Sequence, residues 1–214
     1  MRFAARHWPI VSGVTALVLA LGLGAIVTFR SGQLPFDTAW LEELVEHRTP
    51  LLTAPALVMN FLGGGWFAVF VIPLGVPLVL VLCRKRWSAL YFLLTSAVAA
   101  GLVHLLKALY GRARPSEILV SVDLGSFPSG HVTNAAVIAV ALGLLLRRRW
   151  VWIVGAAYVL LMALSRTYLG AHWLSDTVGG ALTGTAVAIL VWAPFAKAIE
   201  REWSRSPGTT SVAA

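Results

Sequence analysis

His172 and Asp176, near the C-terminal end of the chain, have the residue types and spacing of a nucleophile and the group that orients it. They lie four residues apart, so one helical turn can bring the Asp176 carboxylate to Nδ1 of His172. A carboxylate there fixes the imidazole tautomer and leaves Nε2 as a lone-pair nucleophile. The alternative is structural, with Asp176 helping to cap a helix. We favour the catalytic interpretation, because a carboxylate at the edge of an apolar segment usually has a partner.

A second group of residues that could take part in catalysis is Pro128-Ser129-Gly130-His131, directly before an apolar segment. The free backbone N–H groups of a helix N-terminus there meet a hydroxyl and a glycine that allows close approach, a geometry that binds phosphate. A plain Ser N-cap is the competing explanation for Ser129.

The third group is cationic and comprises Lys107, Arg112 and Arg114, followed later in the chain by Arg166. Arg114 can bind phosphate oxygens with two parallel hydrogen bonds, whereas Lys107 acts as a point charge. A bound anion is the simplest reason for several cations at one end of an apolar segment. The combined set predicts phosphoryl transfer without a metal.

Long apolar segments must position these residues. Of the 214 residues, 58% are hydrophobic and 12% charged, and the mean hydropathy is +0.81, so much of the chain must face lipid. A helix needs about 20 apolar residues to cross a bilayer. We therefore predict an all-α, polytopic membrane protein with a bundle of six transmembrane helices. The spans are Pro9–Phe29, Gly65–Cys83, Trp87–Leu106, His131–Leu146, Trp150–Ser165 and Asp176–Pro194.

Two short helices are predicted between the first two spans. Asp37–Arg48 is amphipathic, with Asp37 as its N-cap, and Thr49-Pro50 opens a second helix that ends at the glycines beginning with Gly63. Both are too short to cross the bilayer, so we expect them to lie along the membrane surface. The first span could be a signal peptide, but it has no convincing cleavage site after it, and we favour an uncleaved anchor.

Other parts of the chain receive structural interpretations. The membrane domain is expected to cover residues 1–205, with a disordered cytoplasmic tail at 206–214. Cys83, the only cysteine, excludes an intrachain disulfide and is expected to be a small buried hydrophobe. Trp173 is expected to be an interfacial anchor, and Asp123 to be solvated.

Clusters of cations mark alternate ends of the six spans, which indicates both termini in the cytoplasm and the candidate active site on the extracytoplasmic side. The same clustering argues against nucleic acid as the partner of a chain with a net charge of +8. The clusters are Arg2 and Arg6, Arg84–Arg86, Arg147–Arg149, and Lys197 with Arg201 and Arg205.

Together the motifs resemble those of the type 2 phosphatidic acid phosphatase family, the integral-membrane lipid phosphate phosphatases. The family signature is Lys-x6-Arg-Pro, then Pro-Ser-Gly-His, then Ser-Arg-x5-His-x3-Asp. The chain matches it at Lys107 to Arg114-Pro115, at Pro128 to His131, and at Ser165-Arg166 to His172 and Asp176.

The resemblance implies a role for each matched residue. His172 would attack phosphorus to give a phosphohistidine, Asp176 would orient His172, and His131 would protonate the leaving oxygen. The phosphoryl oxygens would be held by Lys107, Arg114, Arg166, Ser129 and Gly130. No cofactor and no metal is implied.

The sequence thus predicts a metal-independent lipid phosphatase of the cell membrane, acting on a lipid phosphate or pyrophosphate at the bilayer surface. A membrane transporter that uses Arg166, His172 and Asp176 for ion coupling is the alternative, and a non-catalytic lipid-binding protein is a third. Vanadate haloperoxidases share the same core but are soluble. Gly180 and Gly184 favour close helix packing, either within the bundle or in a homodimer.

Overall fold

The protein is a helical bundle, described here by a computed structural model of residues 2–30 and 33–204. No strand occurs within those residues, which confirms the predicted all-α class. The predicted tail at 206–214 lies outside the described residues. The elements are α1 (Arg2–Phe29), α2 (Pro35–Glu46), α3 (Pro50–Gly63), η1 (Phe67–Val71), α4 (Ile72–Leu82), α5 (Arg86–Tyr110), α6 (Gly130–Leu146), α7 (Arg149–Tyr168) and α8 (Leu174–Ser204).

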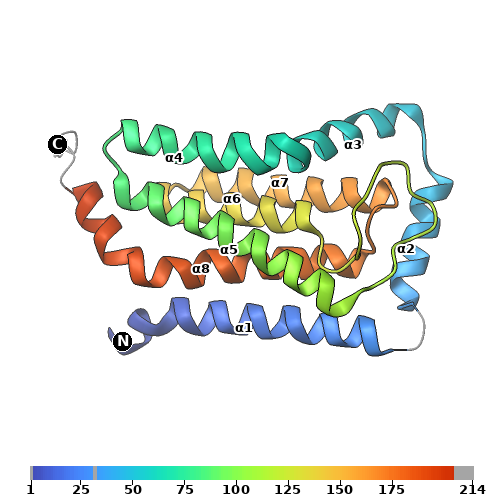
Figure 1. The fold of residues 1–214 in the computed structure, drawn as a ribbon, viewed down its shortest axis with the longest axis horizontal. Coiled ribbons are helices and arrows are strands. Elements are labelled where there is room, and N and C mark those ends of the chain that lie inside the picture. The colour runs from blue at the N-terminus through green and yellow to red at the C-terminus, as the bar shows by residue number, and fades with distance from the viewer. Residues whose placement is uncertain (1, 31–32, 205–214) are drawn as a thin grey trace.

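Helix α8 is the central element of the bundle. It contacts α1, α5, α6 and α7, and these long helices lie roughly side by side (Figure 1). Gly180 and Gly184 allow its close approach to α6, because a Cβ at either position would collide with the carbonyl oxygen of Ser129 or Thr133. This glycine pair therefore serves packing within the bundle.

Four helices in the described ranges are long and apolar enough to cross a membrane: Trp8–Phe29 of α1, and all of α5, α7 and α8. The predicted fourth span corresponds to α6, which has 17 residues. The predicted second span corresponds to η1 and α4, which have 5 and 11 residues and follow each other without a break. Length and composition support four spans, and the count of six stays a prediction.

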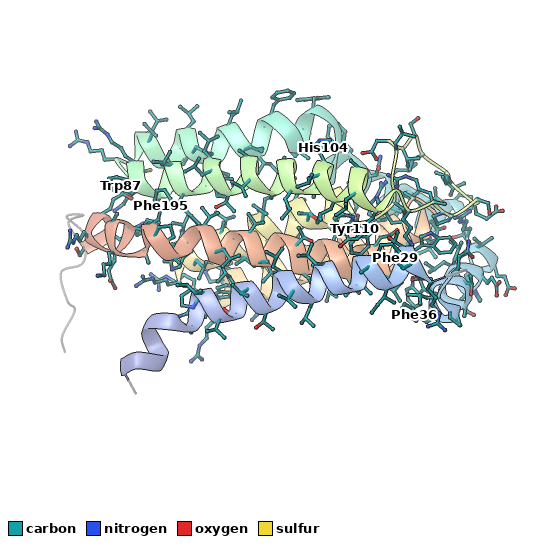
Figure 2. All side chains as sticks on the ribbon, turned by 60° about the horizontal axis from the view of Figure 1, so that its bottom comes forward. Phe29, Phe36, Trp87, His104, Tyr110 and Phe195 are labelled. Atoms are coloured by element: carbon teal, nitrogen blue, oxygen red, sulfur yellow. The ribbon has the colours of Figure 1, made fainter. Side chains whose placement is uncertain are left out.

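Large apolar side chains cover the outside of the bundle. Ile153 is 70% exposed and Leu160 is 64% exposed, and Figure 2 shows side chains projecting outward along the whole length of the helices. Such a surface suits lipid better than water. Cys83 is also exposed, because it lies at the C-cap of α4, beyond the last helical residue. The prediction that it is buried was wrong.

The connections between helices fall into two groups at opposite ends of the bundle. The α4–α5 and α6–α7 connections, which carry Arg84–Arg86 and Arg147–Arg149, lie at the same end as the beginning of α1 and the end of α8 (Figure 1). Helix α2, the 111–129 loop and the α7–α8 connection lie at the other end. Figure 2 places Trp87 and Phe195 at the first end, and Phe29 and Phe36 at the second. The candidate catalytic and phosphate-binding residues therefore lie together at the second end of the bundle.

The two short helices between the first spans differ from expectation at the start of α2, whereas Thr49 is the N-cap of α3 as predicted. Leu34, not Asp37, is the N-cap of α2, and Asp37 lies buried in its first turn. Helix α2 crosses the end of the bundle, but α3 packs antiparallel along the last turns of α7, with Thr53 beside Tyr168 and Ala56 bonded to Ser165 (Figure 1). The Ser165 and Tyr168 hydroxyls hold α3 against α7, whereas its large apolar side chains Leu51, Val58 and Phe61 stay exposed. The expected place of α2 and α3 along the membrane surface stays a prediction.

Candidate active site

His172 lies in the short connection between α7 and α8, where its imidazole is almost completely buried. Its Nε2 is 3.2 Å from an Arg114 guanidinium nitrogen, and its Nδ1 is 3.6 Å from the Asp176 carboxylate. The imidazole of His172 thus lies between Arg114 and Asp176, although the contact to Asp176 is slightly longer than a hydrogen bond.

The contact with Arg114 assigns the tautomer of His172. A guanidinium can only donate hydrogen bonds, so Nε2 must present its lone pair and the neutral imidazole must carry its hydrogen on Nδ1, facing Asp176. Burial lowers the pKa of His172 to about 4, although the Asp176 carboxylate opposes the shift. At neutral pH the side chain is thus an uncharged base whose Nε2 lone pair faces the Arg114 guanidinium.

The Asp176 carboxylate is held by contacts from three directions in the first turn of α8. One oxygen accepts a hydrogen bond of 2.5 Å from Arg112, and the other accepts from the Ser126 hydroxyl and from the Trp173 backbone N–H. The Trp173 side chain is buried and donates to the Ala113 carbonyl, so the prediction of an interfacial anchor was wrong. These contacts fix the carboxylate beside the imidazole.

The Lys107 and Arg114 side chains converge from the end of α5 and the following loop onto one carboxylate, that of Asp123. The Lys107 Nζ lies 2.9 Å from both Asp123 oxygens, and Arg114 donates at 2.6 Å to one of them. Burial alone would raise the pKa of Asp123, but the hydrogen bonds and charges of Lys107 and Arg114 outweigh it and hold that pKa below its usual value. Asp123 is 60% exposed, as expected of a solvated loop residue, and its carboxylate is in addition bound by Lys107 and Arg114.

Helix α3 contributes to the site through Asn60. The Arg166 guanidinium, buried at the end of α7, donates to the Asn60 side-chain oxygen, and the His131 Nε2 lies 3.3 Å from the Asn60 carbonyl oxygen. A carbonyl can only accept, so the contact places a hydrogen on Nε2 of His131. Gly64 makes room for this ring, since a Cβ there would overlap His131 Nε2.

Ser129 is the N-cap residue of α6, but its hydroxyl makes no capping hydrogen bond. The backbone N–H of Ser129 donates to the Asp176 carbonyl oxygen at 3.0 Å, which joins the N-terminus of α6 to that of α8. The buried Ser129 Oγ and Arg166 Nε have no hydrogen-bond partner among the described residues. Both are donors that a phosphoryl oxygen would satisfy.

The family model of the PAP2 superfamily matches residues 88–200, a segment that contains every residue named so far at the site except Asn60 and Gly64. The chain belongs to the PAP2 superfamily.

Relatives and solved structures agree with the PAP2 assignment. The chain is 30% identical over 171 residues to phosphatidylglycerophosphatase B of Bacillus subtilis, an alignment that covers 72% of this chain and 81% of the relative. It is 30% identical over 120 residues to an undecaprenyl-diphosphatase of Sulfolobus acidocaldarius, covering 53% of this chain and 58% of the relative.

The fold is similar to that of the crystal structure of a transmembrane PAP2-type phosphatidylglycerolphosphate phosphatase from Bacillus subtilis. The TM-score is 0.76 at 28% identity, over 92% of this chain and 99% of that one. The crystal structure of LpxE from Aquifex aeolicus gives a TM-score of 0.61 at 26% identity, over 71% and 91% of the two chains. This PAP2 protein is thus a multi-pass membrane protein and a lipid phosphatase, which confirms the predicted class of enzyme.

Two charged residues of the PAP2 site, Asp123 and Asp37, were not among those predicted. Arg112 was predicted to bind an anion with Lys107 and Arg114, and it instead bonds to Asp176 and Asp37. Asp37 donates nothing and accepts hydrogen bonds from Arg112 and Ser175, although sequence reasoning placed it at a helix N-cap. The scarcity of acids was an available signal for the two aspartates, because the chain has only nine acidic residues and two of these are Asp37 and Asp123.

Proposed function

We propose that this PAP2 phosphatase hydrolyses the phosphate monoester or pyrophosphate head group of a lipid at the extracytoplasmic face of the cell membrane, through a phosphohistidine at His172. The observation that carries the proposal is the 3.2 Å contact between His172 Nε2 and Arg114. It sets the lone pair of a neutral imidazole beside a cation suited to a phosphoryl oxygen, which is the arrangement a nucleophilic histidine needs.

In the first step, the Nε2 lone pair of His172 forms a bond to phosphorus while the bond from phosphorus to the leaving oxygen breaks. The leaving oxygen takes a proton from His131 in its imidazolium form, which becomes the neutral imidazole, with its Nε2 3.3 Å from the Asn60 carbonyl oxygen. The positive charge that develops on His172 is stabilised by Asp176, 3.6 Å from Nδ1. Lys107, Arg114, Arg166, Ser129 and the Gly130 N–H bind the phosphoryl oxygens.

In the second step, water attacks the phosphohistidine and transfers a proton to His131. The bond between phosphorus and Nε2 breaks, its electron pair returns to His172, and inorganic phosphate leaves. Both histidines are then as they were at the start, so the cycle needs no oxidant or cofactor.

The substrate is a phosphatidylglycerophosphate or a polyprenyl pyrophosphate, with phosphatidic acid as a third candidate. The support is the names of the Bacillus and Sulfolobus relatives and a cationic site beside the bilayer. Purified protein should be tested for phosphate release from all three lipids in mixed micelles, with His172→Ala as the matched inactive variant. Release that is equal in the two proteins would refute the assigned site.

The proposed topology has six spans, both termini in the cytoplasm and the site outside, because basic clusters mark one end of the bundle. It is tested with single cysteines at positions 120 and 148 after Cys83, itself exposed, has been replaced by Ser. In intact cells a membrane-impermeant maleimide should label position 120 and not position 148. The reverse pattern would put the site on the cytoplasmic side.

A further inference from the structure

A buried ionic cluster joins α2 to the first turn of α8, on the far side of Asp176 from His172. Arg112 donates from one terminal nitrogen to Asp176 at 2.5 Å and from the other to Asp37 at 2.8 Å. The Arg112 side chain also packs near the Trp173 ring, 5.7 Å from its centroid. One guanidinium thus bridges two carboxylates, one beside the nucleophile and one from a helix outside the matched family segment.

The burial of this cluster makes its charge balance important. Asp37 is 1% exposed, Asp176 0% and Arg112 9%. Buried charges interact strongly and are costly when one partner is missing. With Asp37 in place, the positive charge of Arg112 is shared between two carboxylates, so Asp176 retains negative charge that can act on His172. Without Asp37, Arg112 would direct its whole charge at Asp176.

Asp37 also holds the backbone that carries Asp176. One Asp37 oxygen accepts a hydrogen bond of 2.8 Å from the Ser175 N–H, and the other accepts one of 2.6 Å from the Ser175 hydroxyl. Ser175 lies in the first turn of α8, so Asp37 caps the N-terminus of that helix from a different element. The Ser175 hydroxyl in turn accepts from Arg112 at 2.7 Å.

We propose that Asp37 is a positioning residue for the phosphatase reaction. Through Arg112 and Ser175 it fixes the Asp176 carboxylate and offsets the Arg112 charge, so that Asp176 can stabilise the positive charge that develops on His172. The proposal rests on the proposed function of His172 and Asp176. Helix α2, which precedes the segment common to PAP2 proteins, is thereby part of the catalytic apparatus of this chain.

The test is the isosteric variant Asp37→Asn, which keeps the shape of the side chain and removes its charge. We expect kcat to fall by roughly tenfold to a hundredfold with KM changed by less than about twofold, because the loss appears as charge develops on His172 and not on substrate binding. The matched control is Glu43→Gln, which removes a carboxylate from an exposed position on the same helix. Its kcat should equal that of the wild type.

A double variant separates charge balance from simple damage to the fold. If Asp37 offsets Arg112, then Asp37→Asn combined with Arg112→Gln should lose less activity than the product of the two single losses. Additive losses, a loss confined to KM, or wild-type kcat in Asp37→Asn would each overturn the inference. His172→Ala is measured in the same assay. If His172→Ala keeps wild-type activity, the proposed function itself fails. If His172→Ala is inactive and Asp37→Asn has wild-type kcat, only the role of Asp37 is overturned.

Discussion

The Asp123 carboxylate lies 2.9 Å from Nζ of Lys107, through both of its oxygens, and it also accepts a hydrogen bond from Arg114. These are the two cations of the first family motif, which the proposed function assigns to phosphate. A carboxylate from the 111–129 loop therefore binds where the substrate's phosphoryl oxygens would bind. If Lys107 and Arg114 bind the phosphoryl group as proposed, the substrate has to displace the Asp123 carboxylate.

Asp123→Asn should consequently lower KM for the lipid phosphate. The ion pair is partly exposed, with Asp123 60% accessible, so its loss is worth at most about 1 kcal/mol, or roughly twofold to fivefold in KM. Inhibition by inorganic phosphate should strengthen by a similar factor. Glu117→Gln, on the same loop and exposed, is the matched control and should leave KM unchanged. A raised KM in Asp123→Asn would show that Asp123 helps to bind substrate.

His172→Ala should abolish the covalent phosphohistidine intermediate, because it removes Nε2, the nitrogen beside Arg114 whose lone pair is proposed to attack phosphorus. Wild-type enzyme mixed with ³²P-labelled lipid and denatured within milliseconds in alkaline detergent should retain label on the protein, since a phosphohistidine is stable to base and labile to acid. Label that persists in the His172→Ala variant would assign the nucleophile to another residue.

Gly64→Ala should impair His131 without unfolding the protein. The Gly64 backbone has φ of −136°, which any residue adopts, but the added Cβ would overlap Nε2 of His131 and turn the ring away. If His131 protonates the leaving oxygen, kcat should fall by about tenfold to a hundredfold for the lipid and much less for p-nitrophenyl phosphate, whose leaving group needs no proton. Gly75→Ala, in a glycine position with open space around it, is the control. Equal losses on both substrates would remove the acid role from His131.

The stability of the protein should decrease as the pH falls from about 6.5 to about 4, in part because of His172. Burial lowers the pKa of His172 to about 4, against a usual value of 6.5. Between these values the unfolded chain binds a proton that the folded protein does not, so acid favours unfolding. His172→Asn should flatten part of this dependence of the melting temperature in detergent. An unchanged slope in His172→Asn would mean that His172 is not buried in its neutral form.

Activity should survive EDTA, and orthovanadate should inhibit it. The described parts of the chain contain no group of three or more His, Cys, Asp or Glu side chains arranged to hold a metal ion. Vanadate can adopt the five-coordinate geometry of phosphorus in the transition state and bind the same cations. Loss of activity in EDTA that Mg²⁺ or Zn²⁺ restores would contradict the proposed mechanism.

The sequence by itself determined the chemical identity of the site and the helices that carry it. Motif spacing places Lys107, Arg114, His131 and His172 within a turn of a helix end, and apolar runs fix where those helices lie, because both signals are local along the chain. The boundaries of α5 to α8 accordingly fall within a few residues of the predicted spans, except that α8 continues to Ser204.

Only the tertiary structure decided which side chains complete the site. Asp37 reaches Ser175 across 138 positions of sequence, Asn60 reaches Arg166 across 106, and Asp123 folds back onto Lys107. Nothing local distinguishes such residues from an N-cap, an interhelical amide or a solvated loop acid. Their roles depend on how α2, α3 and the 111–129 loop pack on the end of the bundle, and that packing follows from contacts between segments far apart in the chain.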